Sequence, residues 1–229
     1  MRRWRGKAPS LALNAAALLA LCLVISGCAA AAPATPSATQ TSPALAPFNV
    51  VLLGDSIAEG IGATTDSTRW WIRVQTALRA AIPERMIVFK SSAIAGTGLD
   101  DLERTAATVS PLAYQAAVII EGSNDQIDDG AWQSRYAAVI SGLEAKGIVV
   151  VVGTYPPALR AGAFAPAGRN TLIRTFAGPK RPLIDFEQRW RQAGPIAAAP
   201  WYSDDVHAND AGQAIEAEIA LAVFLVLAR

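Results

Sequence analysis

Residues 48–59, F-N-V-V-L-L-G-D-S-I-A-E, predict a buried strand that ends in a polar turn. The apolar run at its start is short and lies between Pro47 and Gly54, which favours a strand over a helix. Ligands of open parallel α/β sheets bind at the carboxyl ends of the strands. Ser56 is therefore a candidate nucleophile, although a serine after Gly-Asp is, by itself, more typical of a turn or a helix N-cap.

The rest of the chain alternates between expected strands and expected helices. This alternation implies a parallel sheet with helices on both faces. We therefore expect an α/β fold, a three-layer α/β/α sandwich around a central, mostly parallel five-stranded sheet. The expected strands after the first are residues 86–89, 116–120, 148–152 and 183–186, and the expected helices are residues 67–81, 99–108, 131–146 and 210–228.

The first 28 residues have the pattern of a secretory leader. A basic start precedes an apolar stretch, residues 11–25, in which only Asn14 is polar, and small residues follow up to Cys28. This is the order of regions in a signal peptide, and the apolar stretch is short for a transmembrane helix. We therefore assign residues 1–27 to a signal peptide.

Residues 25–28, Ile-Ser-Gly-Cys, resemble a bacterial lipobox. The resemblance implies that Cys28 is lipidated and anchors the exported protein to the bacterial cell membrane or envelope. The alternative is an ordinary signal cut near residues 29–32, which would give a secreted protein. Residues 28–47 are rich in Ala, Pro, Ser and Thr and carry no charge, as expected of a flexible tether. Residues 48–229 then form the folded domain.

Composition excludes several classes of function. Four of the 20 basic residues precede Cys28, which leaves 16 basic against 19 acidic residues in the rest of the chain. Such a balance disfavours nucleic acid as a partner, because phosphate neutralisation needs a concentrated basic face. After Cys28 the chain has no cysteine, and its only histidine is His207. The usual zinc sites are therefore excluded, and we expect no metal.

Separated polar residues match the needs of nucleophilic acyl transfer, which requires a hydroxyl, a base, a group that orients the base, and oxyanion donors. Ser56 supplies the hydroxyl and His207 the imidazole. Asp204 lies three residues before His207, a spacing that lets a short loop fold the carboxylate back onto the ring. Gly96 and Asn124 each follow an expected strand, and both residue types suit an oxyanion hole.

The chain resembles the SGNH hydrolase superfamily, also called the GDSL esterases and lipases. The resemblance rests on four blocks in family order, which together extend over nearly the whole expected domain. They are Gly54-Asp55-Ser56-Ile57, Gly96 within Ala93-Ile94-Ala95-Gly96, Gly122-Ser123-Asn124-Asp125, and Asp204-Asp205-Val206-His207.

The sequence departs from the family pattern at several positions. Ile57 stands where leucine is common, Ser91 replaces a frequent asparagine ahead of the second block, and Ala208 replaces the proline that commonly follows the histidine. Gly98 competes with Gly96 for the place of the second-block glycine. In the last block, the spacing favours Asp204 over Asp205.

The resemblance implies the flavodoxin-like SGNH hydrolase fold and a catalytic triad of Ser56, His207 and Asp204. It also implies an oxyanion hole made by the Ser56 and Gly96 backbone N–H groups and the Asn124 side chain, with no cofactor. The expected activity is hydrolysis of short-chain acyl esters or O-acetylated glycans through an acyl-enzyme.

Two other functions remain open, an acyltransferase that uses the same site and an inert binding lipoprotein of the cell envelope. The expected partners are a small-molecule or glycan acyl ester and a membrane, reached through the N-terminal lipid anchor, and we expect a monomer. Trp201, just before the last block, is a candidate for the lining of a substrate pocket.

Overall fold

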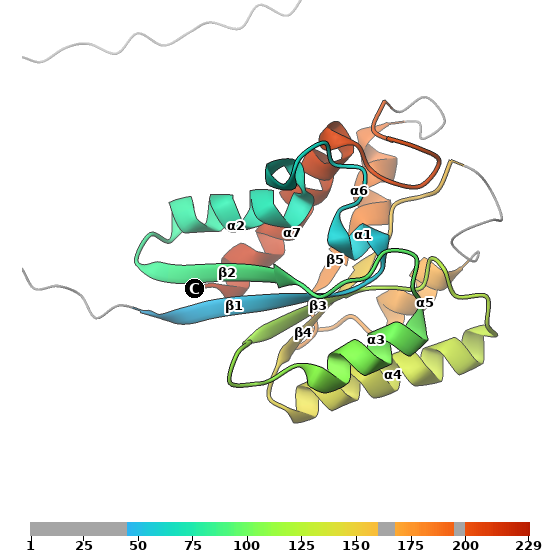
Figure 1. Ribbon diagram of the computed structural model, residues 1–229, viewed down its shortest axis with the longest axis horizontal. Helices are drawn as coiled ribbons and strands as arrows, with labels where there is room; N and C mark the ends of the chain where they lie inside the picture. Colours follow the sequence, from blue (N-terminus) through green and yellow to red (C-terminus); the bar gives the residue numbers. More distant parts are fainter. Residues whose placement is uncertain (1–44, 160–167, 195–199) are drawn as a thin grey trace, which may run out of the picture. The chain divides into compact units, whose positions relative to one another are not determined.

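The computed structural model of the protein describes residues 45–159, 168–194 and 200–229 (Figure 1). The predicted signal peptide, Cys28 and nearly all of the predicted tether lie outside the described residues. None of the helices in the described part is both long and apolar enough to cross a membrane.

A single parallel sheet forms the centre of the described domain. Its strand order is β2-β1-β3-β4-β5, and every neighbouring pair is parallel. The expected α/β class with a five-stranded central sheet is thereby confirmed. The strands are β1 (Leu45–Gly54), β2 (Arg85–Ser91), β3 (Ala116–Ile120), β4 (Val149–Thr154) and β5 (Leu183–Asp185).

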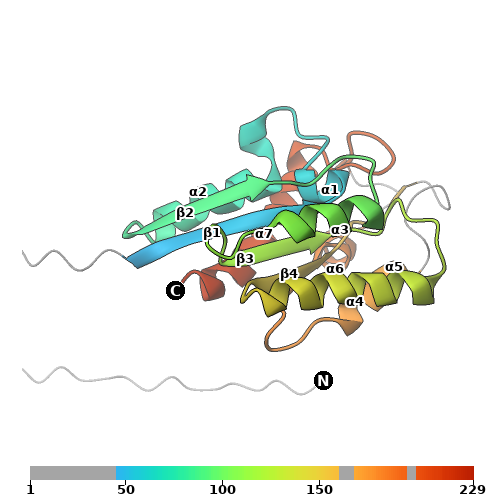
Figure 2. The ribbon, with the colours of Figure 1, turned by 60° about the horizontal axis from the view of Figure 1, so that its bottom comes forward.

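Helices cover both faces of the sheet, as Figures 1 and 2 show. One face carries α2 (Trp70–Ala81), α6 (Phe186–Ala193) and α7 (Asp210–Leu227). The other face carries α3 (Leu99–Thr108), α4 (Asp129–Ala145) and α5 (Arg169–Thr175). Two short elements, α1 (Ser56–Glu59) and the 3₁₀ helix η1 (Asp66–Thr68), follow β1.

The strand order places a switch point between β1 and β3. The chain passes from β1 to β2 on one side and returns to β3 on the other, and such points are where open α/β sheets bind ligands. Gly54 lies opposite Ile120 in the register, so β1 and β3 end at the same level. The segments that follow these two strands therefore emerge side by side.

The core follows from the apolar runs of the central strands. All residues of β3 are fully buried, as are residues 150–152 of β4. Continuous burial of this kind is typical of a strand covered on both faces.

Several features of the fold were not predicted from the sequence. β1 begins at Leu45 rather than Phe48, because Leu45 pairs with Arg85, and the Arg85 Nε–H also donates to the Ala46 carbonyl (2.8 Å). Neither α5 nor α6 was expected. The start of α6 is nevertheless capped by Asp185, whose carboxylate accepts the Gln188 N–H (3.1 Å).

Candidate active site

The turn after β1 is built so that Ser56 lies at the switch point. A Cβ on Gly54 would lie 1.8 Å from the Ile120 carbonyl oxygen, so only glycine permits this close approach. Asp55 caps α1 by accepting the Ile57 N–H (2.9 Å), and its own N–H donates to Ile120 (3.2 Å). Ser56 is then the first residue of α1, and its side chain lines a pocket.

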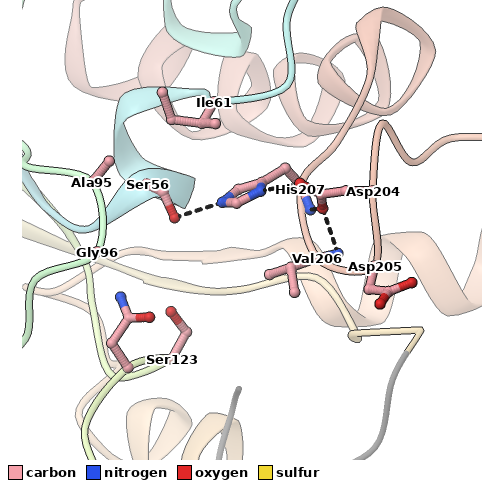
Figure 3. Close-up of a pocket in the computed structure, with 10 residues that line it drawn as sticks. Ser56, Ile61, Ala95, Gly96, Ser123, Asp204, Asp205, Val206 and His207 are labelled. Atoms are coloured by element: carbon pink, nitrogen blue, oxygen red, sulfur yellow. Dashed lines mark hydrogen bonds and ion pairs between the residues drawn. The ribbon is translucent and has the colours of Figure 1, made fainter. Parts of the chain in front are cut away.

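Ser56, His207 and Asp204 form a hydrogen-bonded row (Figure 3). His207 Nε2 lies 2.9 Å from Ser56 Oγ, and His207 Nδ1 lies 2.7 Å from Asp204 Oδ2. Because an ionised carboxylate only accepts hydrogen bonds, Nδ1 carries the proton. In the neutral ring, Nε2 is then free to accept the Ser56 hydroxyl proton.

Asp204 is held by the loop that also carries His207. Its Oδ1 accepts the backbone N–H groups of Val206 (2.8 Å) and His207 (2.7 Å), while Oδ2 faces the ring. Burial alone would raise the pKa of Asp204, but the hydrogen bonds from the His207 ring and from the two backbone N–H groups lower the pKa below its ordinary value. The side chain of Asp205 points away from the imidazole (Figure 3).

The start of α7 fixes the two ends of this loop. The Asn209 side chain caps α7 by accepting the Ala211 N–H (3.0 Å), and its Nδ2 donates to the Tyr202 carbonyl (3.2 Å). The Ser203 N–H donates to the His207 carbonyl (2.9 Å). A helix N-cap thus braces the segment that presents the imidazole.

The block after β3 contacts the block after β1 beneath the pocket. Ser123 Oγ donates a short hydrogen bond to Asp55 Oδ2. Asn124 Nδ2 donates to the Thr97 carbonyl (2.9 Å) and lies 3.5 Å from Asp55 Oδ2. Asn124 is therefore held between two loops, and it lines the same pocket as Ser56.

The structure gives Gly96 and Gly98 different environments. Gly96 lines the pocket with Ser56 and has a left-handed φ of +77°. Gly98 instead caps α3 and packs against Asp125, whose Oδ1 accepts the Leu99 N–H (2.9 Å). Of the two candidates for the second-block glycine, only Gly96 lies at the pocket.

Gly98→Ala should destabilise the protein by about 1–3 kcal/mol, the usual cost of overpacking. The added Cβ would lie 2.2 Å from Asp125 Oδ1, and Asp125 also accepts the Trp132 indole N–H (2.8 Å). Urea unfolding measures the effect. The matched control is Gly142→Ala in α4, where a Cβ meets nothing within 4 Å and should not destabilise. Equal stability of Gly98→Ala and wild type would contradict this packing.

The pocket has a volume of ≈ 370 Å³. Five of its lining residues were named from the sequence as catalytic or oxyanion candidates, namely Ser56, Gly96, Asn124, Asp204 and His207. The other lining residues are Ile61, Ala95, Ser123, Asp205 and Val206. Four of these adjoin motif residues, but Ile61 comes from the loop after α1 and carries no motif signal.

Trp201 does not line this pocket. Its ring packs edge-on against Trp190 (5.6 Å between centroids), and the carbonyl of Trp201 accepts the Asn209 N–H (2.8 Å). The expectation that Trp201 forms part of the pocket is corrected accordingly. The residue packs against the core behind the loop that carries His207.

Two buried carboxyl groups lie under the pocket. Burial raises the pKa of Asp55 to about 6, although Ser123, the Ile57 N–H and His207 lower it in part. Burial and the nearby Asp55 raise the pKa of Glu121 to about 10. Glu121 Oε1 accepts the Gly122 N–H (2.8 Å), while Oε2 has no hydrogen-bond partner in the described part of the chain. Burial beside Asp55 therefore favours the protonated, neutral form of Glu121.

Glu121→Gln should flatten the pH dependence of stability between pH 7 and 9. The ordinary pKa of a glutamate is 4.5, and the pKa of Glu121 in the folded state is about 10. Between these two pH values Glu121 is protonated in the folded state and ionised in the unfolded chain. The unfolded state binds fewer protons, so the free energy of unfolding of wild type falls as pH rises, by at most about 1.4 kcal/mol per pH unit. Glutamine keeps the acceptor and does not titrate.

Urea unfolding at pH 7 and pH 9 measures this difference. The control is Glu103→Gln, because the pKa of Glu103 lies below its ordinary value, owing to the hydrogen bond from Arg135, and Glu103 does not titrate in this range. Parallel pH dependences of wild type and Glu121→Gln would show that Glu121 is ionised in the folded protein.

No cluster of three or more His, Cys, Asp or Glu side chains that could hold a metal occurs among the described residues. The row of a hydroxyl, an imidazole and a carboxylate is the arrangement of an acyl-transfer centre, in which the imidazole takes the hydroxyl proton and the carboxylate orients the imidazole.

The model of the GDSL-like Lipase/Acylhydrolase family matches residues 52–215. The matched range contains all four blocks. A search of curated protein sequences finds no match.

Several solved structures share the fold. A two-domain esterase active on acetylated mannans is 20% identical with a TM-score of 0.65, over 80% of this chain and 49% of that chain. This chain thus spans about half the length of that esterase. The psychrotrophic esterase EstA from Pseudoalteromonas sp., inhibited by monoethylphosphonate, is 16% identical with a TM-score of 0.59, over 79% and 99% of the two chains. TesA is 18% identical with a TM-score of 0.60, over 78% of this chain and 99% of that chain.

Proposed function

Since the chain belongs to the GDSL-like lipase/acylhydrolase family, we propose that it is a carboxylic ester hydrolase and that Ser56, His207 and Asp204 are its catalytic triad. The observation that carries the proposal is the row of two contacts, 2.9 Å from Ser56 Oγ to His207 Nε2 and 2.7 Å from His207 Nδ1 to Asp204. These distances suit a nucleophile, its general base and the group that orients the base.

The proposed reaction runs through an acyl-enzyme. Ser56 Oγ attacks the ester carbonyl carbon while its proton passes to His207 Nε2. The tetrahedral intermediate breaks the bond to the alcohol oxygen, and that oxygen takes the proton from His207. A water molecule then loses a proton to His207 and attacks the acyl carbon, which releases the acid and restores the Ser56 hydroxyl.

The developing oxyanion would lie against Ser56, Gly96 and Asn124. As the first residue of α1, Ser56 has no intrahelical acceptor for its N–H. Gly96 and Asn124 line the pocket beside it. Preorganised donors of this kind stabilise the charge that appears only in the transition state.

We further propose that the acyl group is short. The pocket of ≈ 370 Å³ has the apolar side chains of Ile61, Ala95 and Val206 among its lining residues. The fold is shared with an esterase active on acetylated mannans, so acetyl groups on glycans are included among the candidate substrates.

A panel of p-nitrophenyl esters with acyl chains of two to twelve carbons, together with acetylated mannan, tests this proposal. We expect kcat/KM to be highest for the two- or four-carbon esters and lower for the long-chain esters. If acetyl groups on glycans are the substrate, we expect acetate to be released from the acetylated mannan. Preference for the twelve-carbon ester would overturn the short-chain assignment. Transfer of the acyl group to an added alcohol, in place of acid release, would identify an acyltransferase.

The location of the protein is also a proposal. The lipobox-like residues 25–28 support export and anchoring through Cys28. Incorporation of labelled palmitate that is lost in Cys28→Ser tests it, and unchanged incorporation would exclude Cys28 as the lipid site.

A further inference from the structure

A buried glutamine lies behind the pair Ser56 and His207. Gln213, in the first turns of α7, is 1% exposed. Its Oε1 accepts the Trp70 N–H at the start of α2 (2.8 Å). Its Nε2 donates to the carbonyls of Ile61 (3.3 Å) and Ala208 (3.2 Å). One side chain therefore joins three segments that are far apart in the sequence.

Two of these segments lead directly to the reacting groups. The Ile61 N–H donates to the Ser56 carbonyl (3.0 Å), and Ile61 lies over the Ser56–His207 pair in Figure 3. Ala208 directly follows His207. The contacts therefore close a ring that runs from Ser56 to Ile61, through the Gln213 amide to Ala208, and through His207 back to the Ser56 hydroxyl.

The same two segments also touch directly. A Cβ on Gly62 would lie 2.4 Å from the Ala208 carbonyl oxygen and 2.5 Å from Ser203 Oγ. A second link, between the Thr64 N–H and Asp210 (2.9 Å), lies farther out and is exposed to water. Water does not compete for the hydrogen bonds of the buried Gln213 amide. Losing them therefore costs more free energy than losing the exposed link between Thr64 and Asp210.

We propose that Gln213 is a positioning residue, which sets the separation of Ser56 Oγ and His207 Nε2 by tying the loop after α1 to the loop before α7. The role requires a primary amide. Only such a group accepts the Trp70 N–H on one atom and donates to two carbonyls from the other. The inference rests on the proposed triad, because a fixed separation matters only if these two groups exchange a proton.

The test compares Gln213→Met and Gln213→Asn with wild type. Methionine keeps the length and loses all three hydrogen bonds, while asparagine keeps the amide on an arm shorter by one methylene. Titration with a fluorophosphonate counts the competent sites in each preparation, so that kcat for p-nitrophenyl acetate is expressed per competent site and does not depend on the folded fraction. If Gln213→Met does not fold, Gln213→Asn decides the question.

We expect kcat per site to fall about 10- to 100-fold in Gln213→Met and less in Gln213→Asn, with KM changed by less than about threefold. A displacement of about 1 Å between reacting groups has a cost of this order. The rate constant for phosphonylation of Ser56 should fall in parallel with kcat.

The control is Gln75→Leu. Gln75 in α2 also accepts a backbone N–H from another element, that of Phe89 in β2 (2.7 Å), and this bond involves neither of the two loops. It should lose stability and keep kcat per site. A kcat per site in Gln213→Met equal to that of Gln75→Leu would overturn the inference while leaving the triad intact. An inactive, unlabelled wild type would instead contradict the triad itself.

Discussion

Ser56→Ala should lower kcat for a soluble acetyl ester by about 10⁴–10⁶ while the protein stays folded. The substitution removes the atom that attacks the carbonyl, whereas the pocket and the oxyanion donors remain. Ser56 Oγ has His207 Nε2 as its hydrogen-bond partner, so the fold loses little when the hydroxyl is removed. Steady-state kinetics measure the first effect and thermal unfolding the second.

The same loss is expected for His207→Ala, and the double variant should be no less active than either single variant. Groups that act as one unit lose their effect together, so their contributions are not additive. Ser134→Ala is the matched control, because Ser134 Oγ donates within α4, to the Gly130 carbonyl (2.9 Å), and Ser134 does not line the pocket. Retention of more than about 1% of wild-type kcat in Ser56→Ala would exclude Ser56 as the nucleophile.

Asn124→Ala should lower kcat by about 10²–10³ and change KM little, which is the usual effect of removing one oxyanion donor. The side chain is held by the Thr97 carbonyl (2.9 Å) and lies 3.5 Å from Asp55 Oδ2. The amide is therefore held at the pocket before substrate binds, and its long contact with Asp55 is the one that the oxyanion can replace. The kcat and KM of the variant for the same acetyl ester measure the effect.

Asn49→Ala is the control for this prediction. Asn49 in β1 also donates through its amide to a carbonyl, that of Ala113 (2.9 Å), but in a contact that lies away from the pocket. It should retain wild-type kcat. A loss in Asn124→Ala that appears wholly in KM would indicate substrate binding rather than stabilisation of the oxyanion.

The sequence predicts the parts of the fold that depend on local pattern. The helix over residues 99–108 and the strand over residues 116–120 have the bounds of α3 and β3. Both are bounded by clear signals, with Gly98 before the helix and an uninterrupted apolar run in the strand. Ser56, Gly96 and Asn124 follow strand ends, and a parallel sheet brings such positions to one edge, whereas Asp204 and His207 come from the loop before α7.

The features that were missed depend on contacts between distant residues. In α6 the only buried side chains are Phe186 and Trp190, too few to give a helical period by themselves. The environment of Trp201 is set by its packing against Trp190. The role inferred for Gln213 depends on hydrogen bonds to carbonyls up to 152 residues away. No local pattern reports such contacts, because sequence separation does not fix which side chains meet.

Intact-protein mass measurement after reaction with a fluorophosphonate tests the triad most directly. The account predicts one phosphonyl adduct per molecule, located by peptide mapping on Ser56, with no adduct in Ser56→Ala and a strongly slowed reaction in His207→Ala. An adduct on another residue, or equally fast labelling of wild type and His207→Ala, would contradict the claim that His207 activates Ser56.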